Sequence, residues 1–432
     1  MTPARQYTGI FASLHLPNYR LFFFGMMISN VGLWMFRVAQ DWLVLTELTN
    51  NSAGALGLVT GLQFLPILLL SPWAGAVADR FAKRRLLQVT NIALGLIALL
   101  QAILVLTGTV ALWHVFLIAA LTGVVSAFDG PARQAFVSEM VPESYLTNAV
   151  GLNSTTFNAS RLIGPGLAGL LIAAWGVGPA IAINAVSYLA PLIALTLMDP
   201  AKLHPAPPRR GRGSAREGLS YVRRRPDILL VMFMVFMLGT FGMNFQVTNA
   251  LMATETFRVG PEQYGLMGTV MGIGTLAAAL IAASRSRPRM SVLVGALAGF
   301  TLGMFALTFA PSYWFYLVVL VLVGLCSLTV MTSANVTVQL STEPQMRGRV
   351  MALYMAVFMG GTPLGAPIVG AIGDLFGARA TLLVGALGTG IAVVVALIVL
   401  ARQGVRLRPR LPRRPAETAV GTEAQEAGTA RA

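Results

Sequence analysis

The strongest constraint on this fold is a series of about twelve apolar blocks, each long enough to span a bilayer as a helix. Hydrophobic residues make up 56% of the chain and charged residues only 11%, against about 25% charged in ordinary soluble domains. Alternating ten-residue strands, as in a membrane barrel, are absent from the pattern. The sequence predicts an all-α membrane protein with transmembrane helices near residues 20–46, 54–78, 86–107, 111–128, 149–174, 178–198, 228–251, 264–283, 291–310, 313–338, 350–371 and 380–401.

A basic, proline-rich stretch divides these blocks into two groups of six. It predicts two pseudo-symmetric six-helix bundles (6+6), at 20–198 and 228–401, joined by a cytoplasmic linker at 199–227. Flanking segments at 1–19 and 402–432 are expected in the cytoplasm, and the polar tail is expected to be disordered. The fifth and eleventh blocks also show a weak repeat at a displacement of 201 residues, placing Gly164 on Gly365 and Gly169 on Gly370. Such repeats are typical of transporters whose halves rock about a central site.

Charge predicts the orientation of the chain. When the connections are assigned alternately to two sides, one side receives nearly all the basic residues and the other only Arg258 and Arg379. The positive-inside rule then places both termini in the cytoplasm. The formal net charge of +15 is explained by these loops and by contacts with anionic lipid of the bilayer. Nucleic-acid binding is disfavoured because the basic residues are scattered, without aromatic interleaving or a recognition module.

Several classes of chemistry find no support in the sequence. The single cysteine, Cys326, excludes a disulfide framework, and the three histidines stand apart, so no metal site or other cofactor is expected. A nucleotide-binding Walker A loop needs Gly-Lys followed by Ser or Thr, whereas Lys83 and Lys202 each follow an alanine. No nucleophile–base pair appears, so an enzyme is the least favoured class.

The first connection between blocks reads "GAVADRFAKRRLL". It resembles the signature loop of the major facilitator superfamily, although Lys83 stands where arginine is usual and Ala82 replaces a glycine. The resemblance implies that the loop's aspartate caps the eleventh helix and joins a charge relay with an acid at the end of the fourth, closing the cytoplasmic side. A positively charged loop with one stray acid is the alternative. The candidate gate-loop residues are Gly75, Asp79, Arg80, Lys83, Arg84 and Asp129.

Further stretches resemble one branch of that superfamily, the proton-coupled exporters of the enterobactin-exporter and macrolide-efflux type. They are "DGPARQAFVSEMVPESYLTNAVGLN", "QMRGRVMALY" and "AQDWLVLTELT". The fifth block also resembles the family's antiporter motif, with Ser160 and Ala168 in place of glycines, which implies export. A proline kink in a packing helix would account for the same residues. The matching positions are Gly151, Gly164, Pro165 and Gly169.

Only three charged residues lie well inside a predicted span, and such charges mostly mark substrate or proton pathways. Arg37 and Asp41 are four residues apart and can pair, while Arg161 lies deep in the fifth block. We expect Asp41 to bind the transported proton, with the two arginines tuning it as the halves rock. A static pair that orients the helix is the alternative. The predicted proton-coupling and cavity residues are Asp41, Arg37, Arg161, Asn30, Trp34 and Asn158.

The second half offers only uncharged polar groups at corresponding depth, which suit a large, mostly apolar solute. Hydrogen bonding between helices would explain them equally well. The candidates are Asn244, Gln246, Asn249 and Asn335. Together with the resemblance, these patterns predict a secondary transporter that exports a hydrophobic or amphipathic small molecule (drug, macrolide or siderophore) in exchange for protons, across a bacterial inner membrane. An importer or uniporter of the same fold, and a membrane sensor or assembly factor with a transporter-like body, remain alternatives.

Overall fold

The computed structural model describes residues 9–204, 215–283 and 290–402, and within these ranges the regular structure is helical, without strands. Among these described residues, twelve helical segments are long and apolar enough to cross a membrane, which confirms the predicted number of spans. Helices suit this setting because lipid offers no hydrogen-bond partner to a free backbone group. The predicted tail and most of the linker's first half lie outside the described residues.

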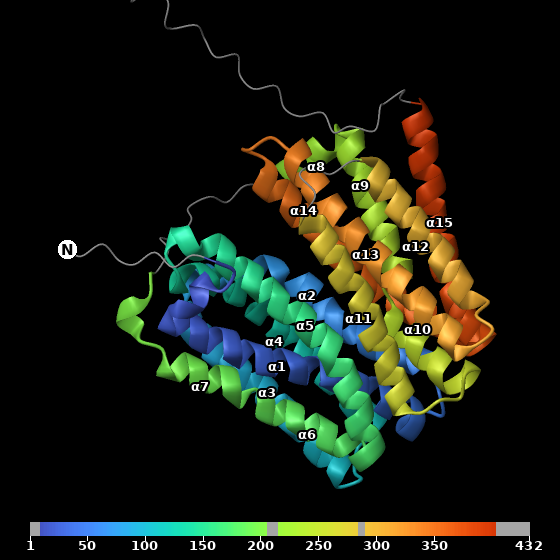
Figure 1. The fold of residues 1–432 in the computed structure, drawn as a ribbon, viewed down its shortest axis with the longest axis horizontal. Coiled ribbons are helices and arrows are strands. Elements are labelled where there is room, and N and C mark those ends of the chain that lie inside the picture. Colours follow the sequence, from blue (N-terminus) through green and yellow to red (C-terminus); the bar gives the residue numbers. More distant parts are fainter. Residues whose placement is uncertain (1–8, 205–214, 284–289, 403–432) are drawn as a thin grey trace, which may run out of the picture.

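The first six spans form one bundle (Figure 1). Its helices are α1 (Pro17–Trp42), α2 (Ala53–Arg80), α3 (Lys83–Leu106), α4 (Leu112–Met140), α5 (Glu143–Trp175), α6 (Val177–Ser187) and α7 (Leu189–Leu197), of which α6 and α7 together make the sixth span. The fourth helix runs to Met140, whereas the apolar block predicted an end near residue 128. Its last three turns carry Asp129, Arg133 and Glu139, which are paired inside the bundle, so hydropathy alone underestimates its length.

The second bundle contains the other six spans and repeats this arrangement. Its helices are α9 (Pro226–Met237), α10 (Phe245–Leu251), α11 (Pro261–Ala283), α12 (Met290–Thr308), α13 (Tyr313–Ser341), α14 (Arg347–Phe376) and α15 (Ala378–Arg402). The seventh span is discontinuous: a π-helical turn at Leu238–Gly242 separates α9 from α10, and Met243 and Asn244 leave the helical conformation. The apolar block gave no sign of this interruption.

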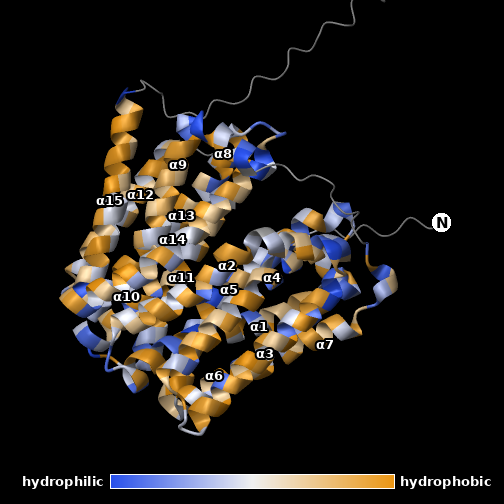
Figure 2. Cartoon of the chain, turned by 180° about the vertical axis from the view of Figure 1, so that it is seen from behind, coloured by the Kyte–Doolittle hydropathy of each residue, from blue (hydrophilic) through white to orange (hydrophobic). Residues whose placement is uncertain are grey.

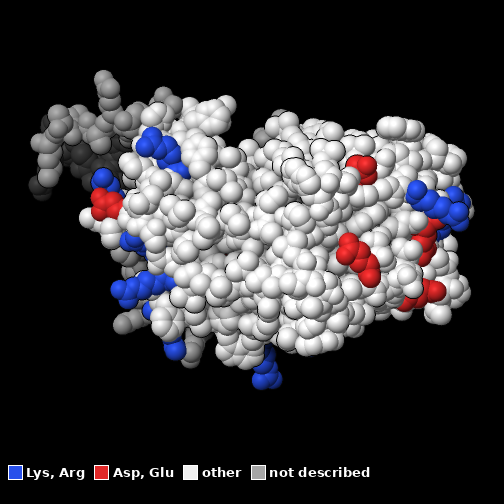
Figure 3. Space-filling view, turned by 90° about the horizontal axis from the view of Figure 1, so that it is seen from below, with Lys and Arg blue, Asp and Glu red and all other residues white. Residues whose placement is uncertain are grey.

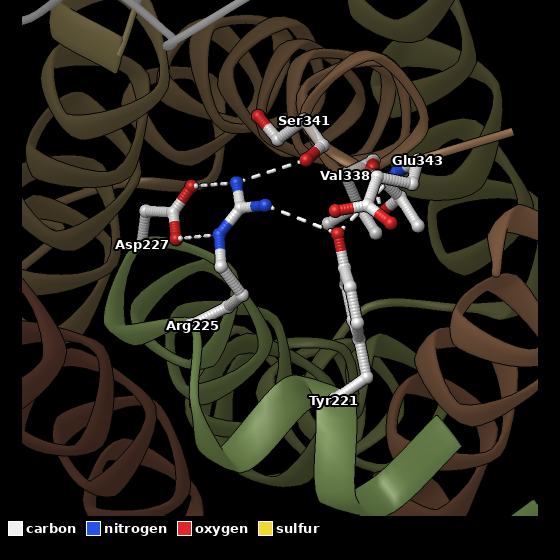
Figure 4. A network of polar contacts seen from close by, with 7 residues as sticks. Tyr221, Arg225, Asp227, Val338, Ser341 and Glu343 are labelled. Carbon is white, nitrogen blue, oxygen red and sulfur yellow. Dashed lines mark hydrogen bonds and ion pairs between the residues drawn. The ribbon is translucent and has the colours of Figure 1, made fainter. Parts of the chain in front are cut away.

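The amphipathic linker helix α8 (Ala215–Arg223) is fastened to the second bundle. Arg225 donates two hydrogen bonds to the carboxylate of Asp227 and one to the carbonyl of Ser341 at the end of α13 (Figure 4). The hydroxyl of Tyr221 completes this network as an acceptor from Arg225. The hydrogen bonds to Asp227 raise the pKa of Arg225 above its ordinary value, so the guanidinium stays charged and links the end of α8 to α9 and α13.

The surface is that of a membrane-embedded protein. Hydrophobic residues cover most of the helix surfaces, and hydrophilic residues gather near the helix ends (Figure 2). On the face shown in Figure 3, charged side chains lie mainly toward the two ends, with a wide uncharged zone between them. Large apolar side chains such as Leu96, Leu280 and Leu302 are more than half exposed, which is costly in water but favourable against acyl chains.

The two bundles meet at only one end. α2 packs against α14 and α5 against α11, and both contacts involve the ends of these helices that lie away from the linker, as at Gly57 beside Ala366 and Gly265 beside Pro165. Toward the ends that carry the N-terminus and α8 the bundles splay apart (Figure 1). The end of the membrane zone where the bundles meet is called the closed end below, and the opposite end, where α1 begins and α8 lies, is called the open end.

Candidate functional site

A cavity of about 310 Å³ lies between the bundles, just inside their closed end. Most of its wall is apolar and made of flexible or aromatic side chains from both bundles. Methionine adapts to irregular shapes, so four methionines suit a solute of variable outline. The large apolar lining residues are Trp34, Phe64, Phe157, Met243, Phe245, Met271, Met331, Phe358 and Met359.

The carboxylate of Asp41 lies in this wall and is only 3% exposed. The hydroxyl of Tyr264, from α11 of the second bundle, donates a hydrogen bond of 2.8 Å to Oδ2 of Asp41. The ring of Tyr264 also stacks on Trp42, the next residue of α1, with centroids 6.0 Å apart. Gln246 of α10 interacts with the same carboxylate. One buried acid of the first bundle, Asp41, is thus held by two groups of the second.

The predicted ion pair between Arg37 and Asp41 is not among the ion pairs of the described residues. The carboxylate is turned instead toward Tyr264, and the guanidinium of Arg37 lies over the ring of Trp34, 4.7 Å from its centroid. Arg161 of α5 lies 5.6 Å from the same centroid. Cation–π attraction to one indole therefore holds both arginines at the cavity wall.

Two hydrogen-bond donors at this stack are unused. The indole Nε1 of Trp34 and the Nε of Arg37 are buried, and neither has a hydrogen-bond partner in the described part of the chain. A buried donor without an acceptor costs free energy, about 1–3 kcal/mol. A bound solute with acceptor oxygens would recover that cost.

The structure separates the other predicted cavity residues. Gln246 and Asn249 line the cavity with Arg37, Asp41 and Arg161. The remaining amides do not line it: Asn30 accepts a hydrogen bond from Arg133, and Asn158 and Asn244 donate to backbone carbonyls of their own segments. Asn335 on α13 is half-buried outside this wall. Tyr264 was missed in the sequence, where a lone tyrosine in an apolar block carries no signal.

The residues of the antiporter motif lie along α5, and the C-terminal half of this helix packs against two other helices, α1 and α11. A Cβ on Gly164 would lie 2.5 Å from the Cβ of Trp34 on α1, and one on Gly169 would lie 2.5 Å from the carbonyl oxygen of Pro261 at α11. The Pro165 carbonyl lies against Gly265 of α11. Gly151, in contrast, has open space around it. Three of the four positions thus form the contact of α5 with both bundles.

The gate-loop residues lie at the open end. Asp79 and Arg80 are exposed, and within the described ranges no hydrogen bond or ion pair of Asp79 is found. Lys83 pairs with Glu139 at 2.7 Å rather than with Asp129, which pairs with Arg133. The reason is the length of α4: its true end brings Glu139, not Asp129, level with the loop. Arg84 donates to the last carbonyls of α7, and Gly75 has no close neighbour.

Two six-helix bundles around a central cavity with buried charges agree with the resemblance of the motifs to the major facilitator superfamily. The fold is similar to that of a solved D-xylose–proton symporter (TM-score 0.68, 15% identity, covering 87% of this chain and 97% of that one). A bacterial homologue of the human lysosomal transporter Spinster, in an inward-facing and unoccupied conformation, is also similar (TM-score 0.66, 13% identity, covering 89% and 94%). These transporters share the fold and are not enzymes.

Within that superfamily, this chain belongs to the transmembrane secretion effector family, whose profile matches residues 8–418. Its relatives include the staphyloferrin A transporter of Staphylococcus aureus, which is 26% identical over 366 residues, covering 83% of this chain and 90% of that protein. The multidrug efflux pump Tap of Mycolicibacterium fortuitum is 27% identical over 377 residues, covering 84% and 91%. The resemblance inferred from the motifs is thereby confirmed, and the chain is a multi-pass membrane transporter.

Proposed function

We propose that this transporter exports an amphipathic small molecule from the cytoplasm in exchange for protons, by alternating access of the central cavity. The observation that carries the proposal is the position of Asp41, a buried carboxylate in the wall of the cavity that is hydrogen-bonded by Tyr264 from the opposite bundle. One proton can therefore act on the substrate cavity and on the contact between the bundles together.

The coupling follows from the chemistry of this hydrogen bond. A hydroxyl bound to an ionised carboxylate forms a charge-assisted bond, roughly twice as strong as a neutral one. Protonation of Asp41 removes that advantage and weakens the tie between α1 and α11. A proton bound at Asp41 thus favours separation of the bundles at the end that is closed here, and by linkage that opened state favours the proton. Protons would then be taken up on one side and released on the other.

The cavity lining supports a particular kind of solute. Aromatic and methionine side chains favour an apolar body, as in a macrolide or another drug. Two guanidinium groups and one carboxylate line the cavity, and the free donors of Trp34 and Arg37 call for acceptor oxygens. We propose an oxygen-rich amphipathic solute and expect simple hydrophobic cations to bind less well. The relatives named for staphyloferrin A and for multidrug efflux are consistent with this range.

The proposal includes the placement of the chain. Both termini and α8 would lie in the cytoplasm of a bacterial cell, as the basic loops indicate, so the state described would open to the cytoplasm. In the opposite state the gate loop would close that side, with Asp79 capping the start of α14 and the Lys83–Glu139 pair beside it. The domain limits 20–198 and 228–401 also remain predictions.

Everted membrane vesicles test the proposal. With an acidic lumen, addition of a transported solute should release luminal protons, recorded with a pH-sensitive dye across a panel of siderophores, macrolides and cationic dyes. Asp41→Asn should abolish solute-driven proton release while leaving the protein folded. Glu47→Gln is the matched control, because Glu47 is an exposed acid further along the same span. Undiminished proton movement in Asp41→Asn would refute the coupling role. Solute uptake that follows an alkaline lumen instead would reverse the proposed direction.

A further inference from the structure

A second carboxylate, which is not part of the cavity wall, ties the bundles together at the closed end. Asp374 lies in the last turn of α14, and its side chain reaches the first turn of α2 in the other bundle. The backbone N–H of Ala53 donates to Oδ1 of Asp374 at 2.6 Å, and that of Gly54 donates to Oδ2 at 3.0 Å. The Ser52 hydroxyl lies 3.3 Å from the same Oδ2.

The contact completes a helix cap that α2 cannot complete alone. The first N–H groups of a helix have no partner within it, and the N-cap residue Ser52 accepts only from Ala55. Asp374 takes the two N–H groups that Ser52 leaves free. Its charge also lies at the positive end of the helix dipole, where an anion is stabilised. The two bundles thus share one cap, donors from one and the acceptor from the other.

We propose that Asp374 is a gating residue that keeps the closed end of the transporter shut by capping α2 from the opposite bundle. This inference rests on the proposed alternation between two facing states. Opening at that end must draw α2 away from α14, because the contact of these helices is concentrated there. The cap then breaks and the two N–H groups are exposed to water. Asp374 therefore stabilises only the state that is closed at this end.

This gate lies at the opposite end of α2 from the gate loop. Asp79 is near the last residue of α2 and Asp374 binds its first, which places the two roughly 39 Å apart at 1.5 Å per residue. In the state described here Asp374 is engaged and Asp79 is exposed. Each end of one helix thus has its own acid, and we infer that the two are used in turn.

Distances between spin labels on the two bundles test the gate without any solute or proton measurement. Labels at Thr109→Cys and Pro311→Cys would report the distance between the bundles at the closed end, because both residues are exposed in connections of different bundles. The labelled variants would carry Cys326→Ser, so that only the introduced cysteines react. In Asp374→Asn the carboxylate charge is lost and the long-distance population should rise by roughly two- to fivefold, the range expected for a charge at a helix terminus. Asp374→Glu should restore part of the closed population, and Glu47→Gln should leave it unchanged.

A second variant protects the test against a folding defect. A Cβ on Gly54 would overlap Oδ2 of Asp374, so Gly54→Ala should displace the carboxylate without removing its charge and raise the same population. If the long-distance population appears in the wild type but neither Asp374→Asn nor Gly54→Ala changes it, the gate is refuted while alternation stands. If that population is absent from the wild type and every variant, alternation itself fails, and the proposed function falls with the gate.

Discussion

Two glycines of the antiporter motif should respond oppositely to the same substitution. Gly164 and Gly151 both lie in α5, and both match the motif. A Cβ on Gly164 would lie 2.5 Å from the Cβ of Trp34 and 3.1 Å from the carbonyl oxygen of Val31, whereas a Cβ on Gly151 would meet nothing within 4 Å. Replacing each by alanine therefore tests whether a glycine of the motif is needed for close packing, as at Gly164, or merely matches the sequence pattern, as at Gly151.

The expected magnitudes follow from two opposing effects. Alanine is favoured over glycine inside a helix by about 1 kcal/mol, and this gain applies at both positions. At Gly164 it is opposed by overpacking against α1, which costs about 1–3 kcal/mol in a close-packed site. Gly151→Ala should then be neutral or slightly stabilising, and Gly164→Ala should be less stable than it by roughly 1–3 kcal/mol. Because Trp34 holds both arginines, Gly164→Ala should also weaken transport.

The measurement is the apparent Tm of each purified variant, scanned at one rate in one detergent, because membrane proteins of this size commonly unfold irreversibly. Transport is measured on the same preparations in vesicles. The order Gly151→Ala, wild type, Gly164→Ala in falling Tm is expected. Equal shifts for the two variants, or a loss of transport in Gly151→Ala alone, would show that the close approach of α5 to α1 is not what this motif provides.

Two other substitutions address the contacts of α8 and α11. Arg225→Gln should free the linker helix by removing its bonds to Asp227 and Ser341. Because the side chains of Arg225 and Asp227 are partly exposed, the loss should be about 1 kcal/mol. Faster proteolysis of the linker in the variant would support this, and an unchanged cleavage rate would not. Tyr264→Phe removes only the hydroxyl that binds Asp41, so it should destabilise the closed end by about 1 kcal/mol and shift the pH at which proton release is half-maximal; a profile identical to that of the wild type would separate Tyr264 from coupling.

The sequence predicted the spans well because bilayer thickness imposes a length that apolar residues must match. The prediction failed at two places where contacts with another helix decide the local structure. The sequence predicted a loop after residue 128, but α4 continues to Met140 because Asp129 is paired there with Thr90 of α3 and with Arg133 of its own helix. The break before Asn244 was hidden for a similar reason, since the backbone of Thr240 is packed against Gly361 and Gly365 of α14. A neighbour absent from the local sequence decides each case.

The charged residues of the candidate site could be predicted from the sequence, but their partners could not. The acid and two arginines in an apolar background are visible in the sequence because each is costly there. Their partners are not visible: Tyr264 and Gln246 come from the second bundle, and which of its residues meets Asp41 depends on how the bundles are packed. Asp374 is similarly hidden, since it lies at the end of a span, where an acid is unremarkable.

The closed end combines contacts of two kinds, and their different physics assigns them different roles. Glycine-mediated packing of α2 on α14 and α5 on α11 is made of dispersion contacts, which depend on shape and not on charge. Lipid drives helices together only weakly, so the opposite state must form comparable packing elsewhere to be reached. The balance between states then depends on the few groups whose bonds differ between them, Asp41 with Tyr264 and Asp374 with α2. Changes at packing glycines that touch neither carboxylate should therefore mainly alter stability, whereas loss of either carboxylate, or its displacement by Gly54→Ala, should alter the populations of the two proposed states.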